Sequence, residues 1–224
     1  GKRAVITGGT HGLGMAMAEG LATAGAELII TGTTPSKLEE ALQYYQAKGF
    51  TASGYLFDVT DEAAAIENIA KIEAQGPIDI LVNNAGIIKR VLAVDMPVED
   101  FRRVIDVDLV GAFIMSREVA KGMIARKSGK IINICSMMSE LGRTNVTAYA
   151  AAKGGLKMLT KNLATEWAPH NIQVNGIGPG YFATSQTAPI RVDGNPFNEF
   201  IISRTPAGRW GDPEAVSYTH LRAH

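Results

Sequence analysis

The stretch Ala4-Val5-Ile6-Thr7-Gly8-Gly9-Thr10-His11-Gly12-Leu13-Gly14 decides the fold of this chain. Its first four residues predict a short buried strand, and after the glycines the apolar side chains recur with helical spacing. A strand, a glycine turn and a helix start in this order aim backbone N–H groups at an anion beside the positive helix end. A glycine-rich turn without a ligand is the alternative. The predicted phosphate-binding residues are Gly8, Thr10, His11, Gly12, Leu13 and Gly14.

Strands and helices alternate along the rest of the chain, without repeats or low-complexity linkers. The apolar patterns predict strands at residues 4–7, 27–31, 51–57, 78–82, 130–134 and 172–175. They predict helices at residues 13–24, 37–48, 63–74, 98–125 and 148–167, and Pro35-Ser36 and Thr60-Asp61 are expected to start two of them. This alternation is typical of an α/β fold, a three-layer Rossmann-type, doubly wound parallel sheet covered on both faces. Residues 181–209, which contain three prolines, are predicted to form a lid or binding loop.

Polar turns follow apolar strands at three further places. Asn83-Asn84-Ala85-Gly86 follows one strand, Ser136 ends the next, and Pro179-Gly180 follows the last. The carboxyl ends of parallel strands lie at one edge of a sheet, where open α/β sheets bind ligands. For the asparagines, ordinary turn chemistry is the alternative explanation.

Tyr149 and Lys153 lie one helical turn apart, so their side chains project from the same helix face. A cation beside a phenol stabilises the phenolate and makes the tyrosine a usable proton carrier. The Ser136 hydroxyl can hydrogen-bond the substrate oxygen that the tyrosine protonates. Taken alone this pair is weak evidence, since surface helices often carry a tyrosine and a lysine at this spacing.

Five motifs in this order resemble the short-chain dehydrogenase/reductase superfamily over residues 2–215. They are Thr7-Gly8-x-x-x-Gly12-x-Gly14, Asn83-Asn84-Ala85-Gly86, Ser136, Tyr149-x-x-x-Lys153 and Pro179-Gly180. Within the superfamily, residues 134–143, 175–181, 186–189 and 204–211 are similar to the bacterial gluconate 5-dehydrogenases. The resemblance implies an oxidoreductase that interconverts a hydroxyl and a ketone of a sugar acid, D-gluconate and 5-keto-D-gluconate above all.

The resemblance also assigns roles to individual residues. Tyr149 is expected to exchange the proton, Ser136 to orient the reacting oxygen, and Lys153 to hold the nicotinamide ribose. The family carries an asparagine where this chain has Asp108, which makes the role of this residue in a proton relay doubtful. Besides the glycine turn, Tyr149 and Lys153, the expected cofactor-binding residues are Thr33, Asp58, Val59, Asn84, Ala85, Gly86, Pro179, Gly180 and Thr184. For Asp58, capping of the following turn is the alternative role.

The choice of cofactor depends on the end of the second predicted strand. NAD-binding folds place a carboxylate there for the adenosine ribose, whereas this chain has Thr31-Gly32-Thr33-Thr34. The missing acid removes repulsion against a 2′-phosphate, and Lys37 or His11 can add positive charge. No arginine stands in the usual phosphate-clamping place. We therefore expect NADP, with NAD also accepted.

A sugar acid needs a cation for its carboxylate and donors for its hydroxyls. The candidates are Arg143, which follows Ser136, and Arg90 or Lys89, which follow the asparagine turn, with Tyr181 covering the substrate. Solvated surface charges and a packing aromatic are the alternatives. Three rival functions remain: reduction of a 3-oxoacyl thioester or another sugar acid, a catalytically silent dinucleotide-binding module, and a fragment that does not fold stably.

Composition narrows the function classes. The chain has 224 residues, 46% of them hydrophobic, and 22 basic residues balance 22 acidic ones. These values fit a single domain, which we place at residues 1–216, and they favour neither a nucleic-acid nor a membrane partner. Cys135 is the only cysteine, so no internal disulfide forms; we expect a buried thiol, a reducing cytoplasmic setting and no metal site.

The ends of the sequence depart from the family pattern. Residues 211–216 resemble the start of a helix, and the family continues through that helix and a final strand. We expect that last helix and strand to be absent because the sequence is truncated or misjoined, and residues 217–224 to be a tail of doubtful origin that is foreign to the family pattern. The resemblance implies a homo-oligomer, a tetramer in the family, where the C-terminal part is present.

Overall fold

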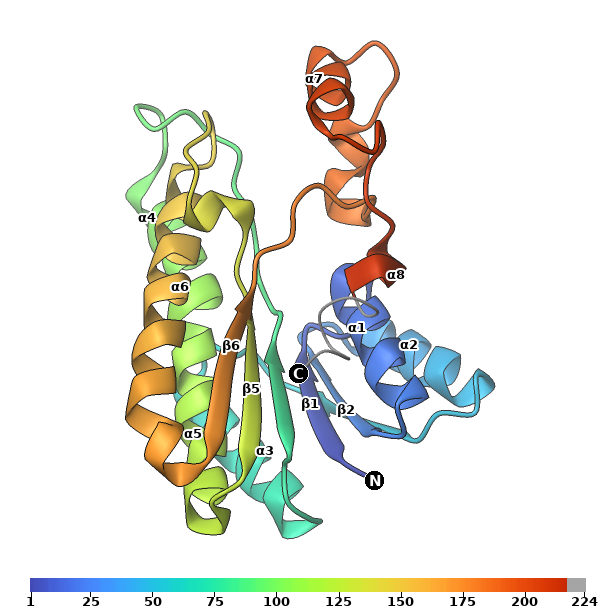
Figure 1. Cartoon of the computed structure of the whole chain (residues 1–224), viewed down its shortest axis with the longest axis vertical. Coiled ribbons are helices and arrows are strands. Elements are labelled where there is room, and N and C mark those ends of the chain that lie inside the picture. Colours follow the sequence, from blue (N-terminus) through green and yellow to red (C-terminus); the bar gives the residue numbers. More distant parts are fainter. Residues whose placement is uncertain (217–224) are drawn as a thin grey trace.

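A computed structural model describes residues 1–216, which form one six-stranded parallel sheet (Figure 1). Its strands are β1 (Arg3–Thr7), β2 (Glu27–Gly32), β3 (Ala52–Leu56), β4 (Ile80–Asn83), β5 (Gly129–Ile134) and β6 (Ile172–Ile177). The strand order is β3-β2-β1-β4-β5-β6, and each neighbouring pair is parallel. The order reverses between β1 and β4, and in such sheets the ligand crevice opens at that point. The predicted Rossmann-type fold is confirmed.

Helices cover the sheet in two layers. On one face lie α1 (Gly12–Thr23) and α2 (Pro35–Ala47), and on the other α3 (Glu62–Ala74), α5 (Gly111–Arg126) and α6 (Thr147–Trp167) (Figure 1). The remaining helices are α4 (Val98–Ile105), α7 (Pro196–Arg204) and α8 (Pro213–Val216). Four short turns of helix complete the list: η1 (Asp106–Val110), η2 (Met137–Ser139), η3 (Ala168–His170) and η4 (Ser185–Ile190).

The core follows from the two-residue period of the strands. Val5 and Ile29 pack against α3 and α5, whereas Ile6 and Ile30 point to the opposite face and pack against α1 and α2. All four side chains are fully buried. Because both faces of the sheet are covered by helices, the strand sequences are continuous apolar runs. Burying each such side chain stabilises the fold by roughly 1.5–3 kcal/mol.

Two predicted helix starts are confirmed by their local chemistry. Asp61 is the N-cap of α3, and its side chain accepts a hydrogen bond of 3.0 Å from the Ala64 N–H. Pro35 occupies the first turn of α2, where a missing N–H costs nothing. The single helix predicted at residues 98–125 instead consists of α4, the π-turn η1 and α5 in direct succession.

No helix within residues 1–216 has the length and apolar character that crossing a bilayer requires. The same part of the chain holds no group of three or more His, Cys, Asp or Glu side chains placed to bind a metal ion. The proposed foreign tail, residues 217–224, lies outside the described residues.

Candidate active site

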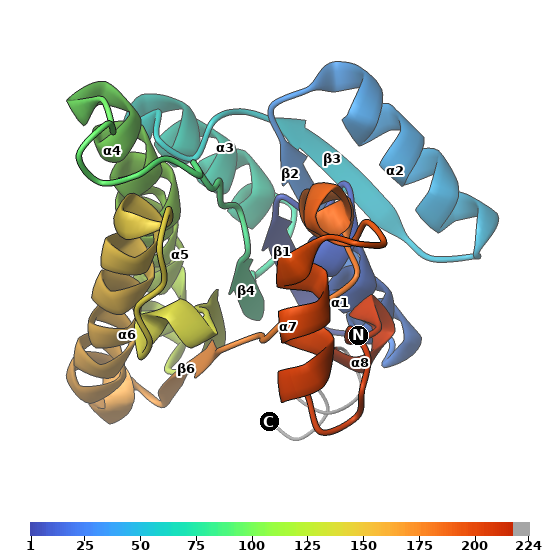
Figure 2. The ribbon, with the colours of Figure 1, turned by 90° about the horizontal axis from the view of Figure 1, so that it is seen from above.

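A cavity of about 580 Å³ opens at the carboxyl ends of the central strands. Seen from above in Figure 2, β1 and β4 lie between the group formed by α4, α5 and α6 and the segment that carries α7. Most of the predicted site residues line this cavity. They are Gly8, His11, Gly12, Leu13, Gly14, Asn84, Ala85, Gly86, Arg90, Asp108, Ser136, Arg143, Tyr149, Lys153, Pro179, Gly180, Tyr181 and Thr184.

The glycine turn is tied directly to the end of β4. The Asn84 side-chain amide donates to the backbone oxygens of Thr7 and Gly8, each at 3.0 Å. Gly8 has a φ of +64°, which favours glycine, and a Cβ at Gly14 would lie 2.4 Å from the Gly8 oxygen. The side chain of His11, the N-cap of α1, forms no capping hydrogen bond. The first N–H groups of α1 therefore lack a side-chain cap beside the cavity, which is suited to a diphosphate.

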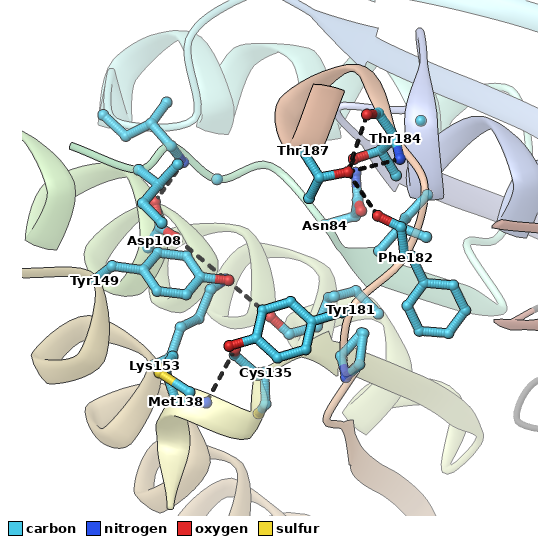
Figure 3. Close-up of a pocket in the computed structure, with 18 of the residues that line it drawn as sticks. Asn84, Asp108, Cys135, Met138, Tyr149, Lys153, Tyr181, Phe182, Thr184 and Thr187 are labelled. Atoms are coloured by element: carbon cyan, nitrogen blue, oxygen red, sulfur yellow. Dashed lines mark hydrogen bonds and ion pairs between the residues drawn. The ribbon is translucent and has the colours of Figure 1, made fainter. Parts of the chain in front are cut away.

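Tyr149 and Lys153 lie on the side of the cavity away from Asn84 and Thr184 (Figure 3), and Ser136 lines the same cavity. The Lys153 Nζ atom lies 5.6 Å from the centre of the Tyr149 ring and donates a hydrogen bond of 2.8 Å to the Ile134 oxygen at the end of β5. Lys153 is 4% exposed, whereas Tyr149 is only half-buried. Ser136 Oγ accepts a hydrogen bond of 3.1 Å from the Met138 N–H. One wall of the cavity thus presents a hydroxyl, a phenol and an ammonium group.

Asp108 enters the same wall from the π-turn η1. Its Oδ1 atom accepts a hydrogen bond of 2.7 Å from the Ile87 N–H, and its Oδ2 atom lies 3.3 Å from Lys153 Nζ. That distance is an ion-pair distance, but the two groups are not aligned as a hydrogen bond, so Oδ2 keeps an unused acceptor position. Burial raises the pKa of Asp108, and Lys153 and the Ile87 N–H offset this only in part. Burial acts to lower the pKa of Lys153, but the Asp108 charge opposes it and the pKa is raised.

Only two of the three cationic residues predicted to bind the substrate carboxylate line the cavity. Arg90 and Arg143 line the cavity, whereas Lys89 forms an ion pair of 3.1 Å with Asp100 and does not line it. Burial, followed by repulsion from Arg143, lowers the pKa of Arg90. The Arg143 guanidinium donates a hydrogen bond of 3.1 Å to the Tyr181 hydroxyl. Arg143 and Tyr181 therefore line the cavity and are hydrogen-bonded to each other.

Four predicted cofactor residues lie away from the cavity: Thr10, Thr33, Asp58 and Val59. Thr33 is exposed just after β2, and the Val59 side chain is buried in the core. Asp58 Oδ1 accepts hydrogen bonds from the N–H and the hydroxyl of Thr60, and Oδ2 forms an ion pair of 2.7 Å with Arg103. The turn-capping role of Asp58 is thus present, and a cofactor contact by these four residues stays a prediction.

Several side chains that organise the site were not among the predicted site residues. Ser139 Oγ accepts from the Ser136 N–H and donates to the Lys153 oxygen, so it ties the serine turn to α6. Thr7 Oγ1 accepts from the N–H groups of Asn84 and Ala85. Cys135 lines the cavity; it is buried as predicted, and burial raises the pKa of its thiol. Thr7 and Cys135 directly precede the predicted residues Gly8 and Ser136, which is the signal that could have identified them.

Comparison with known proteins adds independent information. The short chain dehydrogenase family model matches residues 2–194. The chain is 64% identical, over 97% of its length and 83% of the relative's, to a 2-dehydro-3-deoxy-D-gluconate 5-dehydrogenase from Formosa agariphila. It is 44% identical to a gluconate 5-dehydrogenase from Gluconobacter oxydans, over 96% of this chain and 84% of the relative.

Solved structures agree with this result. A gluconate 5-dehydrogenase from Burkholderia cenocepacia J2315, in complex with NADP and tartrate, superposes with a TM-score of 0.92. Its sequence is 43% identical, and the match covers 97% of this chain and 85% of that one. The fold, the site geometry and these matches together show that the chain belongs to the short-chain dehydrogenase family.

Proposed function

We propose that this chain is an NADP-dependent oxidoreductase that interconverts a secondary hydroxyl and a ketone at C5 of a six-carbon sugar acid. The observation that carries the proposal is that one cavity is lined both by the glycine turn and by Ser136, Tyr149 and Lys153. Arg90 and Arg143 line the same cavity and supply the positive charge that a substrate carboxylate needs.

The residues present fit a dinucleotide. A Cβ at Gly14 would meet the Gly8 oxygen, so only glycine leaves the turn compact enough for a diphosphate against the start of α1. Thr33 and Thr34 follow β2 where a carboxylate would repel a 2′-phosphate. NADP is also the ligand in the Burkholderia structure. We therefore assign NADP as the preferred cofactor, and NAD as a weaker one.

When bound, NADP supplies the acceptor for the hydride that leaves the substrate carbon. The Tyr149 hydroxyl takes the proton of the substrate hydroxyl during oxidation and returns it during reduction. Ser136 Oγ already accepts from the Met138 N–H, so its own proton is free to hydrogen-bond the reacting oxygen. Lys153 directs one N–H to Ile134 and faces Asp108 with its charge, which leaves further N–H capacity for a ribose hydroxyl. Asp108 takes the place of the relay asparagine and binds water through its unused Oδ2 position.

Two substrates of this class are candidates. D-Gluconate is favoured by the sequence resemblance and by the 44% identical relative from Gluconobacter. 2-Dehydro-3-deoxy-D-gluconate is favoured by the 64% identical relative from Formosa. Both carry a carboxylate at C1 and a hydroxyl at C5, so the same catalytic residues serve either one. They differ at C2 and C3, between the carboxylate and the reacting carbon. For the whole enzyme we propose a homo-oligomer in the cytoplasm.

The test is a substrate panel with the purified protein, followed by the absorbance of the reduced nicotinamide. Gluconate and 2-dehydro-3-deoxygluconate are compared with either cofactor, and a 3-oxoacyl thioester serves as the third substrate class. Tyr149→Phe is the matched variant: it is expected to lower kcat by at least about a hundredfold while NADPH binding persists. Turnover of the thioester alone, or unchanged turnover by the variant, would refute the proposal.

A further inference from the structure

Residues 184–210, which we call the lid, leave the body of the protein and return to it at a narrow neck. The neck is closed by two backbone hydrogen bonds, from the Ala183 N–H to the Gly211 oxygen at 2.9 Å and from the Gly211 N–H to the Tyr181 oxygen at 2.8 Å. Figure 1 shows α7, the longest helix of the lid, standing clear of the helices that flank the sheet. A segment attached at one neck can pivot there unless further contacts hold it down.

The lid carries an aromatic cluster that reaches back to its neck. The ring of Tyr181, at the neck, makes edge-to-face contacts with Phe197 at 5.9 Å and with Trp210 at 5.5 Å between ring centres. The Trp210 Nε1–H donates a hydrogen bond of 2.7 Å to the buried Asn198 side chain. The cluster thus joins α7 to the two chain segments of the neck.

A single cation from the opposite wall inserts into this cluster. Arg143 belongs to the loop between η2 and α6, and its guanidinium carbon lies 4.8 Å from the Phe197 ring centre and 5.9 Å from that of Tyr181. The same guanidinium donates to the Tyr181 hydroxyl at 3.1 Å. A cation–π contact of this kind contributes about 0.5–2 kcal/mol, depending on its exposure to water. Arg143 therefore connects the catalytic wall to the lid across the cavity.

Holding Arg143 in this position has an electrostatic cost in the absence of ligand. Arg143 acts on Arg90 by repulsion, which together with burial lowers the pKa of Arg90. Both guanidinium groups line the cavity that holds Tyr149. A carboxylate that binds in this cavity offsets the repulsion with its negative charge.

We propose that Arg143 is a positioning residue that holds the lid to the wall of the cavity, and that a carboxylate bound in the cavity tightens this latch. The inference rests on the proposed sugar-acid function and deepens it, because it makes the charge of the substrate the signal that tightens the latch. Carboxylate binding strengthens the contact of Arg143 with Phe197 and Tyr181, and a latched lid in turn binds the carboxylate more tightly. A neutral polyol with the same hydroxyls lacks this coupling and leaves the latch at its ligand-free strength.

Trp210 provides a direct readout, since it belongs to the cluster, and the chain has only one other tryptophan. The fluorescence of the NADP-loaded enzyme is measured with gluconate, with tartrate as a carboxylate probe, and with the neutral polyol sorbitol. We expect a change with the two carboxylates and none with sorbitol, and loss of that change in Trp210→Phe. An equal response to sorbitol, or a response that persists in Trp210→Phe, would overturn the latch.

Two variants test the latch itself. Arg143→Lys keeps the charge but loses the planar guanidinium, and Phe197→Leu keeps an apolar side chain on α7 but loses the ring. We expect each to abolish the fluorescence response and to lower kcat/KM for the sugar acid about tenfold, mainly through KM. The double variant is expected to be no worse than the single ones, since both break one contact. Multiplicative losses, or a wild-type response in Phe197→Leu, would overturn the proposal.

The readout also separates the latch from the reaction. A carboxylate-dependent Trp210 signal that is lost in Arg143→Lys supports the latch even if no sugar acid is turned over, in which case the proposed function fails alone. Turnover of a sugar acid without any such signal leaves the proposed function intact and overturns the latch.

Discussion

The Nζ atom of Lys153 lies 3.3 Å from Oδ2 of Asp108, and both side chains are almost completely withdrawn from water. The pair joins α6 to the π-turn η1 directly beneath Tyr149. A buried cation without a counter-charge is costly, so each partner depends on the other more than a surface pair would. The pair therefore contributes to stability as well as to the candidate site.

Asp108→Asn is expected to lower the free energy of unfolding by about 2 kcal/mol near neutral pH, because it removes the charge that faces buried Lys153. The folded-state pKa of Lys153 is raised above its ordinary value of 10.5. The stabilisation linked to its proton is complete below that value and is lost as the pH rises through the folded pKa. The difference between the variant and the wild type should thus shrink above pH 10.5, as urea unfolding at several pH values can show.

The control for this pair is Asp100→Asn, since Asp100 and Lys89 form an ion pair of similar length on the surface. We expect it to cost less than about 1 kcal/mol and to lose that cost in salt. Equal losses in the two variants would contradict the structural dependence of Lys153 on Asp108.

Gly14→Ala is expected to disrupt the glycine turn. The new Cβ would lie 2.4 Å from the Gly8 oxygen and 2.5 Å from the Asn84 Nδ2 atom, so the start of α1 has to move away from β1. The affinity for NADPH, measured by fluorescence titration, should fall at least about tenfold, and the melting temperature should drop.

The matched glycine is Gly154 in α6, where an added Cβ meets nothing within 4 Å. Gly154→Ala is expected to raise the free energy of unfolding by about 0.5–1 kcal/mol through its better helix propensity, with NADPH binding unchanged. If both alanine variants bound NADPH like the wild type, the glycine turn would not be the cofactor site.

The elements that sequence predicts well are those fixed by local chemistry. Period-two and period-3.6 patterns located the six strands and the main helices, and Asp61 and Pro35 marked helix starts that the structure has. The candidate site was predictable to the extent that its residues follow strand ends, because a parallel sheet brings those ends together.

Contacts between distant segments were not predictable in this way. The π-turn that aims Asp108 at Lys153 leaves the apolar pattern of the long helix almost unchanged. The contact of Arg143 with Phe197 joins residues whose sequence surroundings show no relation. Arg143 was predicted from its charge and its position after Ser136, and its place in an aromatic cluster depends on how the lid folds back.

A buried polar chain under the site offers the last prediction. Asn83 on β4 donates a hydrogen bond of 2.8 Å to Asn133 on β5, which in turn donates to Thr160 on α6 at 2.9 Å. Asn83 and Asn133 directly precede Asn84 and Ile134, which hold the glycine turn and Lys153. In Asn133→Ala, the Asn83 side-chain amide loses an acceptor. The Thr160 hydroxyl loses the donor from which it accepts a hydrogen bond.

We expect Asn133→Ala to lower the free energy of unfolding by about 2–4 kcal/mol, since each buried polar group that loses its partner costs about 1–3 kcal/mol. Thr160→Val breaks only the last bond of the chain and should cost less. Asn68→Ala, on the partly exposed face of α3, is the control and should stay within about 0.5 kcal/mol of the wild type. Urea unfolding of the three variants decides: if Asn133→Ala costs no more than Asn68→Ala, the polar chain does not hold β4, β5 and α6 together.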